Sequence, residues 1–356
     1  LGLMQSKKIL KILRPIIEIF YAFFSIFILI FLLLYLSDAN FSLAFKGFVN
    51  SSIGGRNNAY LFSTLSKMAL ISGMAIAALV AFRGGLFNIG GEGQLVVGGF
   101  ACAFTGLLVS DFGFIGILIS IISGMLAGAT WAILSGFLTV YMGVPLLVGS
   151  LLLNYPARFI TSYLVSHPFR DVQSGLPQTF LLSKNVWLPY FPNTRLDLGI
   201  LIIFFVYVIC LIIFYYTKHG YHSKNMGHSL SYVKLSGLPT KKIVFKTLAL
   251  SGAIAGIVGS IAVLGIHHRF TDGMLVQPLY AWTGIIAALL VNLNLWFVPL
   301  AGFFFAAIYT GAAGMERIAQ VPKEIATVIQ AVIILFVVGK LGSLTNLSSS
   351  KGDKDD

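Results

Sequence analysis

Apolar stretches long enough to cross a bilayer recur along most of this chain of 356 residues. A hydrocarbon core roughly 30 Å thick requires about 20 apolar residues of helix at about 1.5 Å per residue. The chain is 57% hydrophobic and only 10% charged, so a soluble core could not hide its apolar surface. The sequence therefore predicts an all-α, polytopic membrane protein.

The apolar stretches predict about ten transmembrane helices in one domain, residues 15–345. The expected spans are 15–36, 61–82, 86–109, 114–140, 145–165, 198–217, 243–266, 277–293, 295–315 and 325–340. The first is too long for a signal-peptide core and lacks a small-residue cleavage site, so we expect it to be retained. Residues 1–14 precede the domain, and the polar, low-complexity segment 346–356 is expected to be a disordered tail.

Basic residues predict which face of the membrane each connecting segment occupies. Lysines and arginines concentrate in segment 1–14, in the loop 218–242 and toward the C-terminus. Cytoplasmic segments carry such an excess, and an even number of spans places all three on one side. We therefore expect both termini and the loop 218–242 in the cytoplasm, with the proline-rich, aromatic loop 166–197 on the outer face.

Charge and cysteine content argue against several function classes. The net charge of +12 suits a protein among anionic lipids, and no clustered basic surface indicates nucleic-acid binding. The two cysteines, Cys102 and Cys210, lie in apolar segments without metal-binding spacing. No nucleophile with a neighbouring base is evident, so an enzyme embedded in the membrane is not expected.

One apolar segment contains polar residues, since 86–99 reads LFNIGGEGQLVVGG and includes Asn88, Glu92 and Gln94. Glycine costs about 1 kcal/mol in a helix interior, so the glycine cluster predicts a broken or re-entrant helix near 83–94. Such backbone is tolerated at membrane depth only against protein or water. The three polar side chains are therefore candidates for a translocation path.

Glu92 is expected near a helix N-terminus, where the dipole favours negative charge, with Arg83 as a candidate structural ion pair. A path residue and a pair that locks two helices together are both consistent with the sequence. Asn154, Tyr155 and His267 are further path candidates, because polar side chains in apolar segments face the bundle interior. Interhelical hydrogen bonds, or for His267 anchoring at the membrane boundary, are the alternatives.

The glycine-rich segment also carries a family resemblance. Residues 82–94, FRGGLFNIGGEGQ, resemble the signature of ABC importer permeases in the ribose, branched-chain amino acid and nucleoside superfamily, particularly its nucleoside and simple-sugar branch. Further likenesses to that branch are LLLNYPARFITSYLV at 151–165, SGLPQT at 174–179, LSGAIAGIVGSIAVLGIHHRF at 250–270, WTGIIAALL from Trp282 and VPKEIATVIQAVIILFV from Val321.

The resemblance implies a permease subunit that moves nucleosides, purine nucleosides first, across a bacterial inner membrane by alternating access. Simple sugars and riboflavin are the alternative substrates. Pro145 and Leu146 stand where the family commonly has an Asn-Glu pair, and Thr283 where aspartate is usual, which bears on substrate identity. Outside the family, an ion-coupled secondary transporter is the alternative, for which two matching halves would be expected.

Energy is expected to come from a separate ATPase, because the chain has no G-x-x-x-x-G-K-[ST] phosphate-binding motif. ATP and magnesium would bind that partner, so this chain is predicted to be no enzyme and to hold no cofactor. The resemblance also implies a second permease chain, related but different, and an extracytoplasmic substrate-binding lipoprotein.

A short coupling helix is implied within the loop 218–242, ending before Gly237 and Pro239. The expected coupling residues are Ser229, Leu230, Tyr232, Val233, Lys234, Leu235 and Gly237. In this hypothesis Leu230, Val233 and Leu235 form the apolar side that docks into the ATPase. A solvated basic loop is the alternative.

Overall fold

The computed structural model describes residues 40–54 and 58–320, together with isolated positions 24, 28, 32, 324, 328 and 331. Within these residues the chain is helical, and its β-type pairing consists of two isolated bridges. Six of the described helices are long and apolar enough to cross a membrane. The all-α class is therefore confirmed over this range. The expected segments 1–14 and 346–356 lie outside it, and the expected spans 15–36 and 325–340 are described only at isolated positions, so the count of ten stays a prediction.

Six of the expected spans correspond closely to long helices of the described chain. The described helices are α2 (Phe41–Ile53), α3 (Ala59–Arg83), α4 (Gly91–Leu108), α5 (Phe114–Met142), α6 (Leu146–Leu152), α7 (Asn154–Ser166), α8 (Gly199–Tyr216), α9 (Lys218–His228), α10 (Leu230–Leu235), α11 (Thr240–Ile261), α12 (Tyr280–Leu290) and α13 (Val298–Ala319). A π-helical turn, Ala262–His267, extends α11. Helix α2 was not predicted.

The expected span 145–165 is divided into α6 and α7. Pro156 lies in the first turn of α7, where it lacks an amide hydrogen and its ring would clash with the carbonyl of Leu152 in a continuous helix. The chain therefore breaks at Leu153, between the two helices. This break places Asn154 at the start of a new helix.

Helix α3 forms the centre of the bundle, because every residue from Ala69 to Phe82 is buried. A helix that is buried on all sides must be surrounded by others. Helix α11 packs against α5, α4 and α3, and α13 packs against α2 and α3. This arrangement leaves the apolar outer face of α5 and much of α8 exposed, as lipid-facing helices require.

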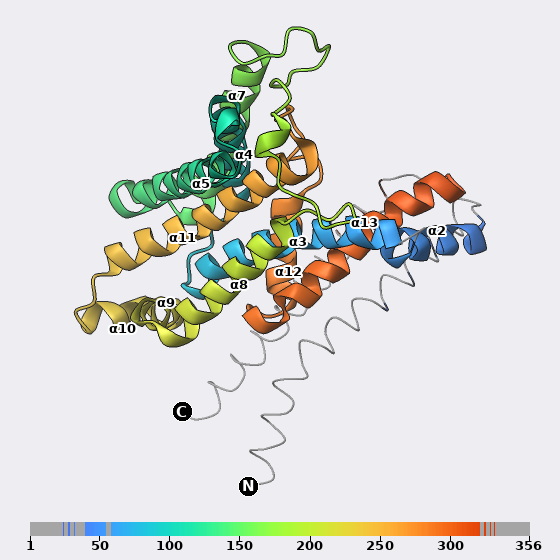
Figure 1. Ribbon diagram of the computed structural model, residues 1–356. Coiled ribbons are helices and arrows are strands. Elements are labelled where there is room, and N and C mark those ends of the chain that lie inside the picture. The colour runs from blue at the N-terminus through green and yellow to red at the C-terminus, as the bar shows by residue number, and fades with distance from the viewer. Residues whose placement is uncertain are drawn as a thin grey trace.

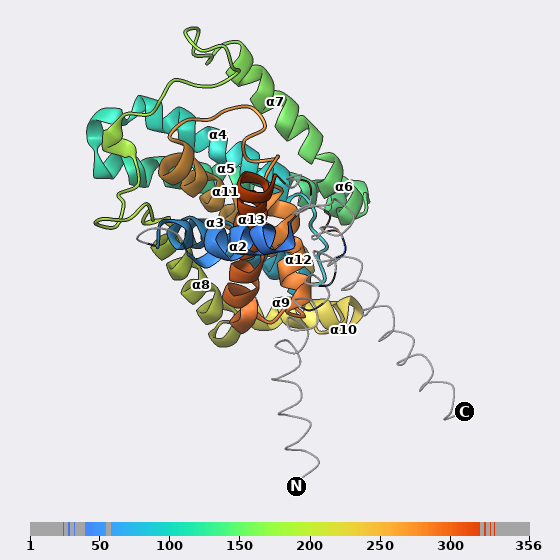
Figure 2. The same cartoon turned by 90° about the vertical axis from the view of Figure 1, so that its right-hand side faces the viewer.

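The bundle has two distinct ends: the loop that follows α7 lies at the top of Figures 1 and 2, and α9 and α10 lie at the lower left of Figure 1 and at the bottom of the coloured ribbon in Figure 2. At the first, the loop end, residues 166–197 pack against the chain that follows α11: Leu188 N donates to Leu264 O at 3.0 Å and Thr179 N to Phe270 O at 2.9 Å. At the second, the helical end, α9 and α10 join α8 to α11. Because α8 and α11 each run from one end to the other, the loop 218–242 lies opposite the loop 166–197.

Glycines allow α5 and α11 to touch through their backbones. A side chain on Gly256 would lie 2.9 Å from the carbonyl carbon of Gly124 and 3.2 Å from the Cα of Met125. Close approach of this kind is the usual way in which membrane helices associate.

We expect Gly256→Ala to lower the free energy of unfolding by about 1–3 kcal/mol, because a methyl group there overpacks two backbones that cannot yield. The change is measured as thermal or denaturant unfolding of the purified chain in detergent. Gly175→Ala is the matched control, since nothing lies within 4 Å of a side chain at that loop position. Equal stabilities of the two variants would contradict the close packing of α5 on α11.

Candidate functional site

The chain between α3 and α4 runs back into the bundle without forming a helix, as the glycine cluster predicted. Gly85 has a φ of +72°, and a side chain there would lie 3.1 Å from the Cα of Gly227 in α9, at the helical end. A side chain on Gly91 would lie 3.2 Å from Met74 Cε, in the middle of α3. Met74 lies roughly 13 Å from Arg83 along α3. Helix α4 therefore begins near mid-depth and runs toward the loop end.

Side-chain amides hold this irregular backbone in place. Asn88 Oδ1 accepts from Gly90 N at 3.0 Å and from Gln94 Nε2 at 3.2 Å. Asn154 Oδ1 accepts from Gly93 N at 2.8 Å, while its Nδ2 donates to Ile89 O at 3.1 Å. Backbone groups without helical partners must be satisfied internally at membrane depth. Asn88, Gln94 and Asn154 thus form intramolecular hydrogen bonds, which for Asn154 is the alternative that the sequence left open.

We expect Asn154→Leu to lower the free energy of unfolding by about 2–4 kcal/mol, because it leaves a buried amide donor and a carbonyl acceptor unpaired at about 1–3 kcal/mol each. The measurement is unfolding of the purified chain in detergent. Asn185→Ala, at an exposed position in the loop 166–197, is the control. A stable Asn154→Leu protein would mean that the two bonds do not hold the segment.

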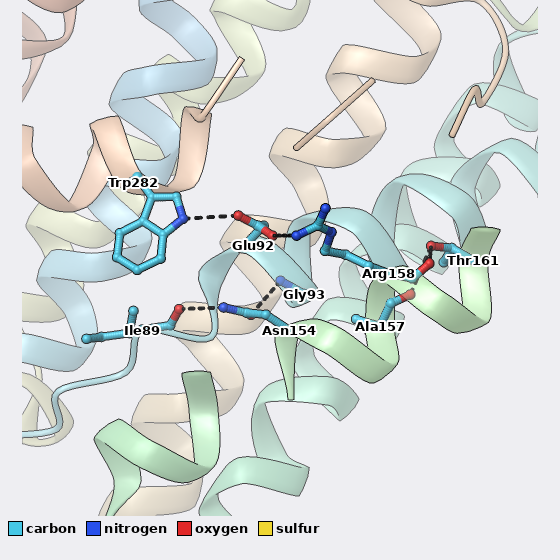
Figure 3. Close-up of polar contacts among 8 residues, drawn as sticks. All are labelled: Ile89, Glu92, Gly93, Asn154, Ala157, Arg158, Thr161 and Trp282. Carbon is cyan, nitrogen blue, oxygen red and sulfur yellow. Dashed lines mark hydrogen bonds and ion pairs between the residues drawn. The ribbon is translucent and has the colours of Figure 1, made fainter. Parts of the chain in front are cut away.

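Glu92 lies at the centre of a small polar cluster built from three helices (Figure 3). Trp282 Nε1, in the first turn of α12, donates to Glu92 Oε2 at 3.1 Å. Arg158 Nη1, from α7, lies 3.7 Å from Glu92 Oε1. Arg158 and Trp282 were not among the predicted site residues. Arg158 could have been identified from the sequence, because it lies within the expected span 145–165 and ionisable residues inside membrane spans usually mark functional sites.

The expected ion pair between Arg83 and Glu92 is wrong. The guanidinium of Arg83 lies over the rings of Phe214 and Tyr215, with its Cζ 4.9 and 5.2 Å from their centroids. Arg83 ends α3 at the helical end, whereas the re-entrant chain takes Glu92 to mid-depth. Arg83 and Glu92 are therefore close in the sequence but lie at different depths in the bundle.

Two helices begin beside each other at this point. Glu92 is in the first turn of α4, and a side chain on Gly91 would lie 3.9 Å from the Cβ of Ala281 in the first turn of α12. The chain before α12 also returns from the loop end to mid-depth, since a side chain on Gly284 in α12 would lie 2.5 Å from Met74 Cβ. This second re-entrant segment was not predicted. Two helix N-termini with their partial positive charge thus face the Glu92 carboxylate.

The cluster opens onto one side of the chain. A cavity of about 220 Å³ is lined by Arg158, Thr161, Asp272 and Gln277 among others. The side chain of Arg158 is 48% exposed and that of Glu92 only 8%. Tyr155, which the sequence proposed for a path, is exposed on the same helix as Arg158. The carboxylate is therefore anchored in the protein while its arginine partner reaches an open polar surface.

His267 is not part of this cluster. It ends the π-helical turn at the loop end, and its Nε2 has no hydrogen-bond partner within the described chain. The neighbouring His268 stacks on Trp187 with centroids 3.7 Å apart, and its Nε2 lies 2.9 Å from Tyr190 OH. Burial lowers the pKa of His268. These contacts fasten the loop 166–197 to the end of α11.

The loop 218–242 forms two short helices rather than one. Val233 is fully buried against Met226 and Ile243, so its expected place on the docking surface is wrong. Leu230 is 48% and Leu235 89% exposed, and Ser229, Lys234 and Gly237 are also exposed. The side chain of Tyr232 lies outside the described part of the chain. Among the described side chains of α10, Leu230 and Leu235 are therefore the apolar ones available to a partner, and Val233 holds α10 onto the bundle.

Comparison with known proteins identifies relatives over most of the chain. A family model described as the permease component of branched-chain amino acid transport systems matches residues 60–338. The guanosine ABC transporter permease protein NupP of Bacillus subtilis is 29% identical over 284 residues, which cover 78% of this chain and 80% of the relative. The nucleoside permease NupB of Lactococcus lactis is 26% identical, covering 94% and 93%. The glucose permease TsgB13 of Haloferax volcanii is 27% identical, covering 76% and 73%.

Proposed function

Because this chain belongs to the family of permease components of branched-chain amino acid transport systems, we propose that it is the membrane-spanning subunit of an ATP-driven nucleoside importer. The observation that carries the proposal is the Glu92 cluster, a carboxylate held at mid-depth between two helix N-termini beside an open polar cavity. Intramembrane ionisable groups in such a position usually lie on a transport path. Asn88, Gln94 and Asn154 support this path by fixing its backbone.

The exposed side of Arg158 supports a paired arrangement. A half-exposed guanidinium at membrane depth is costly against lipid tails, so it requires water or protein beside it. We propose that a second, related permease chain covers this face and that the path runs between the two subunits. Alternating access would then open the Glu92 cluster first toward the loop end and later toward the helical end.

Purine nucleosides are the proposed substrates. Two of the relatives described above carry guanosine or nucleoside in their names, and one carries glucose. Trp282 presents a partly exposed ring beside the Glu92 carboxylate, and Tyr155 presents an exposed ring on the same helix as Arg158. Nucleobases stack readily on aromatic side chains of this kind. Simple sugars and riboflavin are the alternatives, to be distinguished by competition against labelled guanosine uptake.

We propose that each end of the bundle binds a different partner protein. An extracytoplasmic substrate-binding lipoprotein would deliver the nucleoside at the loop end, and an ABC ATPase would receive Leu230 and Leu235 of α10 at the helical end. ATP and magnesium would bind the ATPase, with no cofactor on this chain.

Affinity purification of the tagged chain from its native membrane tests this assignment. An ATPase subunit and a second permease chain should copurify in a fixed ratio. An ion-coupled secondary transporter would copurify with neither. Recovery of the chain as a stable transporter without an ATPase would contradict the proposal.

The orientation of the chain in the membrane can be tested separately. In intact cells, a membrane-impermeant maleimide should label Gly175→Cys in the loop 166–197 and should reach Ser231→Cys in α10 only after permeabilisation. Both positions are exposed, and the native Cys102 and Cys210 are buried. Labelling of both cysteines from outside would contradict a cytoplasmic α10.

A further inference from the structure

A second polar cavity, at the loop end, lies apart from the Glu92 cluster and is lined by several cationic side chains. It occupies about 730 Å³ between α2, α3, α13 and the chain before α8. Lys67, Arg195 and Arg317 line it, and Asp197 is the carboxylate among its lining residues. Serine, threonine and tyrosine hydroxyls make up much of the remaining surface. The lining therefore carries more positive than negative charge.

Lys67 approaches the cavity from α3 without a carboxylate partner. Its Nζ donates to Tyr280 OH at 2.6 Å and lies 5.4 and 5.5 Å from the ring centroids of Tyr280 and Tyr309. The sole ion pair between described residues joins Arg158 to Glu92, so none of the three cavity cations lies within 4.0 Å of a described carboxylate oxygen. A partly buried ammonium group has three donors, and a neutral phenol satisfies only one of them.

Asp197 lies in the same cavity but forms no ion pair with these three cations, and its carboxylate accepts from the Ser66 side chain and from the backbone. Its Oδ1 accepts from Gly199 N at 2.7 Å and so caps the first turn of α8. Arg317 is held at the rim, where its Nη2 donates to Ser51 Oγ at 3.2 Å and its guanidinium stacks over the ring of Tyr60. Its Nε also donates to Ala313 O at 3.3 Å and its Nη1 to Tyr60 OH at 3.4 Å. The arginine is thereby positioned before any ligand arrives, and the remaining N–H donors of its five can bind one.

We propose that this cavity binds a phosphate-type oxyanion, with Lys67 as its inner contact and Arg317 and Arg195 at its rim. A planar guanidinium and an ammonium group with spare donors, joined by hydroxyls, are the chemistry that recognises such an anion. Binding would tie α2 and α13 to α3 and to the chain before α8. The anion could come from a phospholipid headgroup or from a soluble phosphate, and the experiment separates these sources.

The test is thermal unfolding of the purified full chain in a neutral detergent during titration. The first arm titrates inorganic phosphate against chloride at constant ionic strength. The second titrates short-chain phosphatidylglycerol, with a short-chain diacylglycerol that lacks the phosphate as its reference. A saturable rise in melting temperature in the first arm identifies a soluble oxyanion, and a rise in the second arm alone identifies a lipid headgroup. Either result supports the site if the variants below respond as expected.

Lys67→Met and Arg317→Gln should each weaken the apparent affinity by about tenfold or more, because each removes a charge-assisted contact. Arg170→Gln, an exposed arginine in the loop 166–197, should leave it unchanged. If Lys67→Met does not fold, Arg317→Gln and Arg195→Gln carry the comparison. The proposal is overturned if neither arm stabilises the wild-type chain, or if the cavity variants bind as tightly as Arg170→Gln does.

Discussion

Glu92→Leu is expected to reduce substrate transport by about 10-fold to 150-fold, equivalent to the roughly 1.5–3 kcal/mol carried by a hydrogen bond to a charged group. The carboxylate accepts from Trp282 at 3.1 Å and faces Arg158 at 3.7 Å, so its loss leaves an unpaired arginine beside the proposed path. Transport per folded molecule is the quantity to measure, with uptake normalised to protein recovered by gel filtration.

Glu92→Gln separates the two interpretations of this residue. The amide oxygen still accepts from Trp282, so the packing of α4 on α12 is kept while the charge is removed. If Glu92 only locks helices together, Glu92→Gln should be nearly as active as wild type. If it lies on the path, transport should fall while stability changes little. Glu316→Gln, at an exposed position in α13, is the charge-matched control.

Leu235→Asp is expected to abolish transport and substrate-stimulated ATP hydrolysis while the membrane domain still folds. Leu235 is 89% exposed, so the bundle does not depend on it. Docked into an ATPase, the new carboxylate would be buried without a partner at a cost of several kcal/mol, or roughly 100-fold or more in affinity. The measurement is ATPase retention on the purified permease together with uptake.

Val233→Asp would fail to give the same information, because Val233 is buried in this chain and its substitution would unfold α10 itself. Lys224→Ser, at an exposed position in α9, is the control and should have little effect. Normal ATPase binding and transport in Leu235→Asp would make α10 a solvated connector, and the motor would have to engage elsewhere.

The bilayer explains how much of the fold could be predicted from sequence. Its thickness sets helix length, so the spans that became α3, α4, α5, α8, α11 and α13 were visible as apolar stretches. The division of 145–165 was also predictable in principle, since Pro156 lacks the amide hydrogen that a continuous helix needs. Helix α12 is harder to predict, because a segment that descends without helix and then forms a short one has the same hydropathy as a full span.

The candidate site, like the fold, could be predicted only in part from the sequence. Asn88, Glu92 and Gln94 could be identified because polar residues in an apolar segment need partners. Their partners could not, since Trp282 and Arg158 reach Glu92 only through the packing of α12 and α7 against α4. Val233 was misplaced for a related reason. Helix α10 has six residues, too few for periodicity to distinguish the face packed on the bundle from the exposed one.

Uptake by reconstituted vesicles tests the central claim most directly. The chain, copurified with its second permease and ATPase, is placed in liposomes with ATP inside and the binding protein with labelled guanosine outside. The account predicts guanosine accumulation that requires ATP hydrolysis, persists when ion gradients are collapsed, and is lost with Leu235→Asp. Accumulation that continues without ATP and stops when an ion gradient is removed would contradict it.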